Sequence, residues 1–173
     1  LSVSFNNMTN GYRFEPTRLT RGYKAGLNEE AYFDDVIISP SEYAGRMVVR
    51  PQFPSDTGEL YPFLLRLYED TDNFLEVYYL GTSDKFVVAK KVSGTWLAAY
   101  SPVMSFAQDE EIEIGWSFDS TNGLKVFVNG SNTGATNQAS TTTWTVALAP
   151  STAYIGFNGA TYPNDYIIDD LEI

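Results

Sequence analysis

The chain has 173 residues, with 11 Lys and Arg against 22 Asp and Glu, a net charge of −11, and neither His nor Cys. These counts exclude a Ser-His-Asp triad, thiol catalysis, His- or Cys-based zinc sites and disulfide bridges. An acidic chain with scattered basic residues is also a poor partner for nucleic acid. Because 43% of the residues are hydrophobic and no apolar run is long enough to span a membrane, we expect one globular domain over residues 1–173.

Alternation of apolar and polar residues with a period of two predicts strands along most of the chain. In chain order, the expected strands are Leu1–Phe5, Gly22–Gly26, Tyr32–Ile38, Gly45–Gln52, Pro62–Glu69, Phe74–Leu80, Lys85–Val92, Thr95–Tyr100, Glu110–Phe118, Leu124–Val128, Ala153–Phe157 and Tyr166–Ile173. The polar stretch Ser131–Thr143 is expected to be a long surface loop. Frequent turn signals and the lack of a helical stripe predict an all-β fold, a two-sheet antiparallel jelly-roll sandwich.

The order of the motifs after residue 62 resembles the laminin G-like branch of the concanavalin A-like lectin/glucanase superfamily. The matching stretches are FLLRLYEDTDNFLEVYYLG, KFVVAKKVSGTW, EIEIGWSFDSTNGLKVFVNGSNTG, YIGFNG and YIIDDLEI. In the N-terminal third the match is looser, but the family would place a first strand beside the last one. The resemblance implies a jelly roll with a concave face, often with a structural calcium ion, and binding rather than catalysis.

The hairpin over residues 63–80 supplies the candidate ligand-binding face. Strict alternation in its first strand places Phe63 with the core residues Leu65 and Leu67, and Leu64 on the opposite, polar face. Carbohydrate sites combine flat aromatic rings with carboxylates, amides and Arg, and pairing across the hairpin gathers such groups on the polar face. The expected contact residues are Arg66, Tyr68, Glu76, Tyr78, Trp96 and Tyr100. The competing interpretation is an ordinary outer sheet face with a cross-strand Arg–Glu pair.

The other two tryptophans differ in what the pattern predicts for them. Trp116 alternates with Ile112 and Ile114, so we expect it in the core. Trp144 lies inside a Thr-rich segment, where an exposed platform and a ring packed onto the core remain equally open.

Two Asp-Asp pairs form the candidate calcium site. Asp34 and Asp35, and Asp169 and Asp170, lie on strands near the two ends of the chain. Calcium prefers carboxylate and carbonyl oxygens, but adjacent residues on a strand point to opposite faces, so one Asp of each pair at most faces a given ion. The turn at residues 70–73 mimics part of an EF-hand loop, but it lacks the Gly and the bidentate Glu, and we interpret it as an ordinary Asx turn.

Glu111 and Glu113 are the candidate catalytic residues. The superfamily includes glycosidases with a pattern similar to E-x-D-x-x-E, in which two carboxyl groups about 5–5.5 Å apart perform retaining hydrolysis. Alternation puts Glu111 and Glu113 on one face, but no third acid follows them at the required spacing. We therefore interpret the pair as the solvated start of a strand and assign no catalytic residue.

We therefore expect a noncatalytic binding module, extracellular or on a cell or virion surface, that recognises a glycan or a protein surface. The first alternative is a structural or decoration domain of a virus or phage particle or a surface layer, which works through protein–protein contacts and forms a homo-oligomer. The second alternative is a glycan-cleaving enzyme that uses Glu111 and Glu113.

Overall fold

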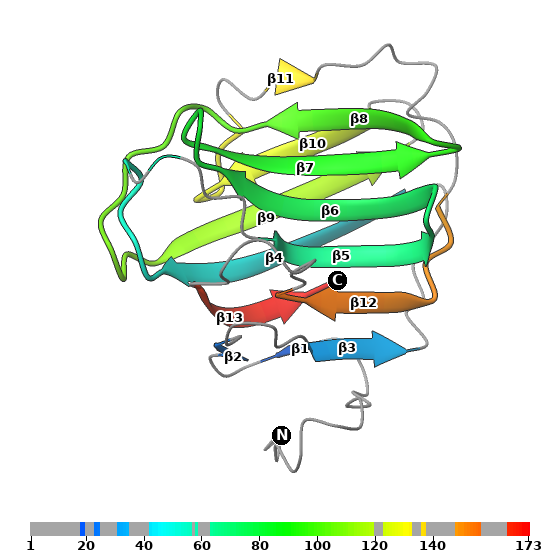
Figure 1. Ribbon diagram of the computed structural model, residues 1–173, viewed down its shortest axis with the longest axis horizontal. Helices are drawn as coiled ribbons and strands as arrows, with labels where there is room; N and C mark the ends of the chain where they lie inside the picture. Colours follow the sequence, from blue (N-terminus) through cyan, green and yellow to red (C-terminus); the bar gives the residue numbers. More distant parts are fainter. Residues whose placement is uncertain are drawn as a thin grey trace.

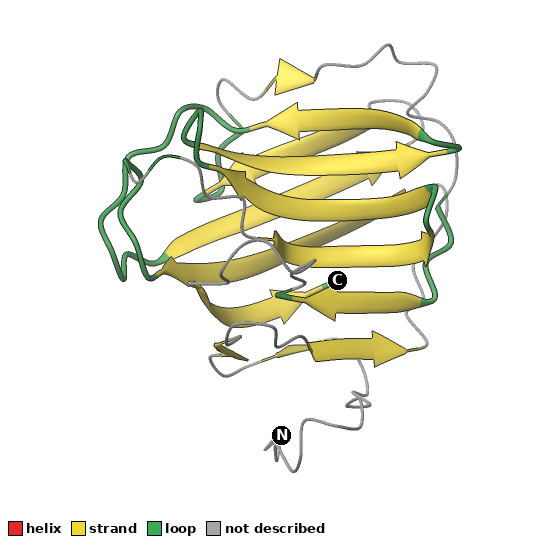
Figure 2. Cartoon of the chain, in the orientation of Figure 1, coloured by secondary structure: helices red, strands yellow, loops and turns green. Residues whose placement is uncertain are grey.

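The computed structural model describes residues 18–19, 23–24, 31–34, 42–56, 58, 63–119, 123–132, 136–137, 148–156 and 166–173. The regular elements of these residues are all β-strands, joined by turns and loops (Figure 2). A helix with the length and apolar character needed to cross a membrane does not occur in the described part of the chain.

Two antiparallel sheets lie one behind the other, and their strands cross obliquely (Figure 1). The seven-stranded sheet has the order β11 (Thr136–Asn137), β8 (Thr95–Tyr100), β7 (Lys85–Val92), β6 (Asn73–Leu80), β5 (Phe63–Asp70), β12 (Thr152–Ile155) and β3 (Ala31–Asp34). The six-stranded sheet has the order β1 (Arg18–Leu19), β13 (Tyr166–Glu172), β4 (Glu42–Pro51), β9 (Ile112–Asp119) and β10 (Gly123–Val128), with β2 (Tyr23–Lys24) also paired to β13. The predicted all-β, two-sheet jelly-roll sandwich is confirmed.

The core lies between the sheets and is built from alternate residues of each strand. On β9, Ile112, Ile114, Trp116 and Phe118 are buried, while the residues between them face outward. Trp116 is 1% exposed, so its predicted place in the core is confirmed.

A charged side chain of β7 lies inside this apolar layer. Lys90 of β7 is fully buried, and its ammonium nitrogen lies 3.7 Å from the ring centroid of Phe118. Burial removes water from the ammonium group and lowers the pKa of Lys90 to about 8.

A β-bulge in β5 changes which of its side chains face outward. Phe63 pairs with Tyr78 and Leu65 pairs with Val77, so Leu64 is the extra residue between them. Leu64 is fully buried, whereas the Phe63 ring packs against Tyr78 on the outer face, with 5.6 Å between ring centroids. The faces predicted for Phe63 and Leu64 by strict alternation are therefore wrong, because the inserted residue reverses the phase before Leu65.

Some strand boundaries also differ from the prediction. β4 begins at Glu42 instead of Gly45, and the short edge strand β11 lies within the stretch predicted to be a loop. β1, which was not predicted, pairs with the last strand, β13. The expected first strand Leu1–Phe5 lies outside the described residues.

Candidate functional site

All six predicted contact residues lie on the outer face of the seven-stranded sheet. The register of β6, β7 and β8 arranges the outward side chains of these strands in three rows across the sheet. From β6 to β8 the rows are Phe74–Lys91–Trp96, Glu76–Ala89–Ala98 and Tyr78–Val87–Tyr100. Arg66 and Tyr68 of β5 continue two of these rows opposite Glu76 and Phe74.

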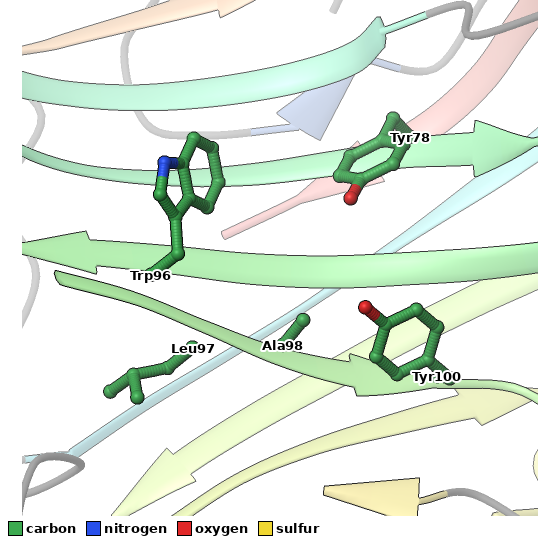
Figure 3. Close-up of a pocket in the computed structure, with 5 residues that line it drawn as sticks. All are labelled: Tyr78, Trp96, Leu97, Ala98 and Tyr100. Atoms are coloured by element: carbon green, nitrogen blue, oxygen red, sulfur yellow. The ribbon is translucent and has the colours of Figure 1, made fainter. Parts of the chain in front are cut away.

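A pocket of about 270 Å³ opens on this face. It is lined by Tyr78, Trp96, Leu97, Ala98 and Tyr100 (Figure 3). The small side chain of Ala98 leaves space between Trp96 and Tyr100 on β8, and the phenol oxygens of Tyr78 and Tyr100 are turned toward each other (Figure 3). Trp96 is 50% exposed. The pocket therefore offers aromatic surface to an apolar group and hydroxyl groups to a polar one.

Turn chemistry places Trp96 at the end of this pocket. Ser93 and Gly94 have φ values of 49° and 78°, which are typical of a two-residue type I′ hairpin turn and fix the register of β7 and β8. The Ser93 N–H donates to Asn73 Oδ1 (3.0 Å), and the Gly94 N–H donates to the Asp72 carbonyl (3.2 Å). The turn before Trp96 is thus held against the neighbouring β5–β6 turn.

A chain of ring contacts connects the two ends of the pocket. The Trp96 ring packs edge-on against Phe74 at 5.2 Å, and the Arg66 guanidinium lies 4.8 Å from the Phe74 ring centroid. The same guanidinium lies 5.6 Å from the ring of Phe63, which packs against Tyr78. Arg66 therefore supports Trp96 on one side and Tyr78 on the other, and does not line the pocket itself.

Glu76 is the ion-pair partner of Arg66. The Arg66 side chain donates from Nε and Nη2 to Glu76 Oε1, and the exposed fractions of the two side chains are 18% and 2%. Burial raises the pKa of Glu76, while the charge and the hydrogen bond of Arg66 act in the opposite direction. The cross-strand Arg–Glu pair of the competing interpretation is thus present, beside the pocket.

Tyr68 lies away from the pocket lining, where its ring packs edge-on against Tyr154 with 6.0 Å between ring centroids. Tyr78, Trp96 and Tyr100 are the predicted contact residues that line the pocket. Sequence reasoning missed the supporting rings of Phe63 and Phe74. Phe74 could have been identified from the pairing of the hairpin strands, because it lies opposite Tyr68. Phe63 could not, because the β-bulge reverses the face that alternation predicts for it.

The candidate catalytic glutamates belong to the other sheet. Glu113 lies on the outer face of the six-stranded sheet, where Arg46 Nη1 donates to its Oε2 at 3.1 Å. Glu111 is exposed and precedes β9. Arg46 also binds Asp170 at 3.0 Å and Glu172 at 2.9 Å, so Glu113 is part of an ion-pair cluster. The pocket and these acids are on opposite faces of the sandwich.

The candidate calcium ligands are distributed over both sheets. Asp169 pairs with Arg50 at 2.6 Å and Asp170 with Arg46, while Asp34 ends β3 at the edge of the other sheet. Asp35 lies outside the described residues, as does Trp144. Within the part of the chain that is described, no three acidic side chains form a group suited to a metal ion. Calcium binding stays a prediction; a lower melting temperature in chelator, restored by added calcium, would support it.

Comparison with known proteins gives matches by structure. No protein-family model and no curated protein matches the sequence. The binding domain of botulinum neurotoxin serotype G superposes with a TM-score of 0.63 at 10% identity, over 90% of this chain and 38% of that one. The receptor binding domain of botulinum neurotoxin D gives 0.63 at 8% identity, over 90% and 39%. The CBM40 of the IT-sialidase of Ruminococcus gnavus gives 0.59 at 11% identity, over 90% and 89%.

The chain thus spans less than half the length of the toxin domains but most of the CBM40 chain. At such low identities the likeness shows the fold alone, a two-sheet antiparallel jelly roll. The concanavalin A-like superfamily stays a prediction. The laminin G-like branch is not singled out and stays a prediction.

Proposed function

We propose that this domain is a noncatalytic binding module that recognises carbohydrate through the pocket between Tyr78, Trp96 and Tyr100. The observation that carries the proposal is the exposure of Trp96. In the described residues, Trp96 and Val103 are the large hydrophobic side chains that remain exposed, and Trp96 is one of the residues that line the pocket. An indole face covered by the C–H surface of a sugar ring loses its contact with water, which favours binding.

Three further observations support the proposal. The phenols of Tyr78 and Tyr100 supply hydroxyl groups that donate to and accept from sugar hydroxyls. The fold is shared with the CBM40 of a sialidase and with neurotoxin receptor binding domains. The ion pairing of Glu113 with Arg46 gives no reason to prefer a catalytic role. Because glycans are displayed outside cells and on particles, the proposed function places the domain at such a surface.

A glycan array followed by calorimetry tests the proposal. We expect Trp96→Ala and Tyr78→Ala each to weaken binding of the array hit at least about tenfold, or ~1.4 kcal/mol. Phe127→Ala is the matched control, because Phe127 is a half-buried aromatic residue of β10 in the other sheet. Full binding by both pocket variants would move the site elsewhere.

Failure to bind any glycan would overturn the proposed function. Light scattering then distinguishes the architectural alternative, since a stable trimer or larger assembly points to a domain that acts through protein–protein contacts. A glycan that is cleaved rather than bound, with loss of cleavage in Glu111→Gln or Glu113→Gln, would instead favour an enzyme.

A further inference from the structure

The charges around the pocket define the class of sugar that it accepts. We infer that the pocket selects uncharged sugars and discriminates against sugars that carry carboxylate or sulfate groups. This inference rests on the proposed function, because it specifies the ligand class of the same pocket.

Among the residues that the structure describes, those lining the pocket carry no ionisable group other than the two phenols. Tyr78, Trp96, Leu97, Ala98 and Tyr100 contribute rings, an indole N–H, backbone groups and hydroxyls, and none contributes a cation. A charge-assisted hydrogen bond from Arg or Lys is the strongest hydrogen bond that a protein side chain offers to a carboxylate or sulfate. The lining itself therefore offers an anionic sugar no such partner.

Two cations on this face, Arg66 and Lys91, already bind anions or carbonyls of the protein. Arg66 forms the buried ion pair with Glu76. Lys91 lies 3.0 Å from Asp72 Oδ1 and donates to the Thr71 carbonyl at 2.8 Å. An anionic ligand would have to compete with these intramolecular partners, and separation of the Arg66–Glu76 pair would leave a buried carboxylate without its cation.

Lys85 is the cation that could act against this inference. Its ammonium nitrogen lies 5.9 Å from the ring centroid of Tyr100, beside the pocket. A contact between a cation and a ring face stabilises the position of the Lys85 ammonium group without an anion. Replacement of Lys85 therefore distinguishes a pocket that binds uncharged sugars from one that binds anionic sugars.

The surroundings of the pocket also favour a ligand without charge. β11 pairs with β8 at Tyr100, and its two residues, Thr136 and Asn137, carry no charge. The net charge of −11 adds a long-range repulsion for anions.

Calorimetry with matched oligosaccharides tests the inference. The probes are tetrasaccharides of glucose, galactose and mannose and the corresponding uronic acid tetrasaccharides, at about 0.05 M and 0.5 M salt. We expect a neutral tetrasaccharide to bind at least tenfold more tightly than its uronic acid counterpart, with an affinity that does not change with salt. We also expect Lys85→Met to leave the neutral affinity within twofold of that of the unmodified chain.

The opposite preference overturns the inference while the proposed function stands. Equal or tighter binding of a uronic acid tetrasaccharide, weakened at high salt and lost in Lys85→Met, would assign Lys85 as the anion-binding group. Lack of binding by every member of the panel and by the glycan array would overturn the inference and the proposed function together.

Discussion

Arg66 and Glu76 form an ion pair within the outer face of the seven-stranded sheet, and the Glu76 side chain is almost completely buried. The guanidinium also lies between the rings of Phe63 and Phe74, which in turn contact Tyr78 and Trp96. The pair therefore contributes both to stability and to the shape of the pocket.

Arg66→Met is expected to destabilise the fold by about 2–4 kcal/mol, because it leaves the buried Glu76 carboxylate without its cation. The double variant Arg66→Met/Glu76→Leu should regain most of this free energy of unfolding, since an apolar pair removes the uncompensated charge. Urea unfolding of the unmodified chain and both variants measures the difference. A loss below about 0.5 kcal/mol in Arg66→Met would contradict a structural role for the pair.

The loss in Arg66→Met should also depend on pH. Burial raises the pKa of Glu76 above 4.5, and removal of Arg66 takes away the interactions that oppose this rise. A carboxyl group with a raised pKa in the folded state stabilises that state below its unfolded pKa, and this contribution is lost as the pH rises through the folded pKa. We therefore expect a smaller gap between Arg66→Met and the unmodified chain near pH 4.5 than near pH 8, by urea unfolding at both pH values.

Lys90→Met is expected to stabilise the protein at pH 7. The pKa of Lys90 falls from 10.5 to about 8 on burial, which corresponds to roughly 3 kcal/mol of penalty for the charged form. Loss of the contact with Phe118 offsets up to about 2 kcal/mol of this gain. Denaturant unfolding should therefore show that the free energy of unfolding of Lys90→Met is about 1 kcal/mol higher than that of the unmodified chain. A less stable variant at pH 7 would show that the buried ammonium group is net favourable.

The difference in stability between Lys90→Met and the unmodified chain should disappear at high pH. A depressed pKa leaves the penalty fully present below about 8, and it fades as the pH rises toward 10.5, the value in the unfolded chain. Lys125→Met, which replaces a half-buried lysine on the outer face of β10, serves as the control for the loss of a lysine at pH 7 and pH 9.5.

Gly45→Ala should be one of the most destabilising small substitutions in the chain. A Cβ at Gly45 would lie 2.3 Å and 2.6 Å from two ring carbons of Trp116 and 2.9 Å from the Glu172 carbonyl oxygen. Because Trp116 is closed in by the core, relief of this clash requires movement of a strand, and we expect a loss of about 2–3 kcal/mol.

Gly115→Ala is the matched control for Gly45→Ala. On the adjacent strand β9, its added Cβ would meet Phe127 Cβ at 3.5 Å, the Gly45 carbonyl oxygen at 3.7 Å and Phe127 Cδ2 at 3.9 Å, which are ordinary contacts. Alanine also restricts the unfolded chain, so we expect a change between zero and a gain of about 1 kcal/mol. Equal losses of melting temperature in the two variants would show that contact with Trp116 is not the cause.

The hairpins were the most predictable part of the fold. β7 and β8 have the predicted bounds, because the alternation of their residues and the Ser93-Gly94 turn specify the same register. The same local signals placed Tyr78, Trp96 and Tyr100 on one face, since the direction of a strand side chain follows from its position in the sequence alone.

Features that depend on distant contacts were not predictable in this way. The bulge at Leu64 has no marker in the sequence, because Leu is acceptable on either face until the partner strand defines the register. Lys90 occupies a core-facing position in the alternation of β7 although it is charged. The sequence of β7 does not show that the opposing sheet buries its ammonium group. β11 is too short for its alternation to be detected and is defined by pairing with β8.

The position of β13 has a consequence for the order of folding. This strand lies between β1 and β4 in the six-stranded sheet, and Arg46 of β4 reaches across to both Asp170 and Glu172. During synthesis, one edge of β4 stays unpaired until β9 has left the ribosome, and the other edge stays unpaired until β13 has followed. Long-range pairing of this kind makes folding slow and leaves exposed strand edges open to association with other chains. The ribosome-bound chain is thus the stage at which this sandwich is most susceptible to misassembly.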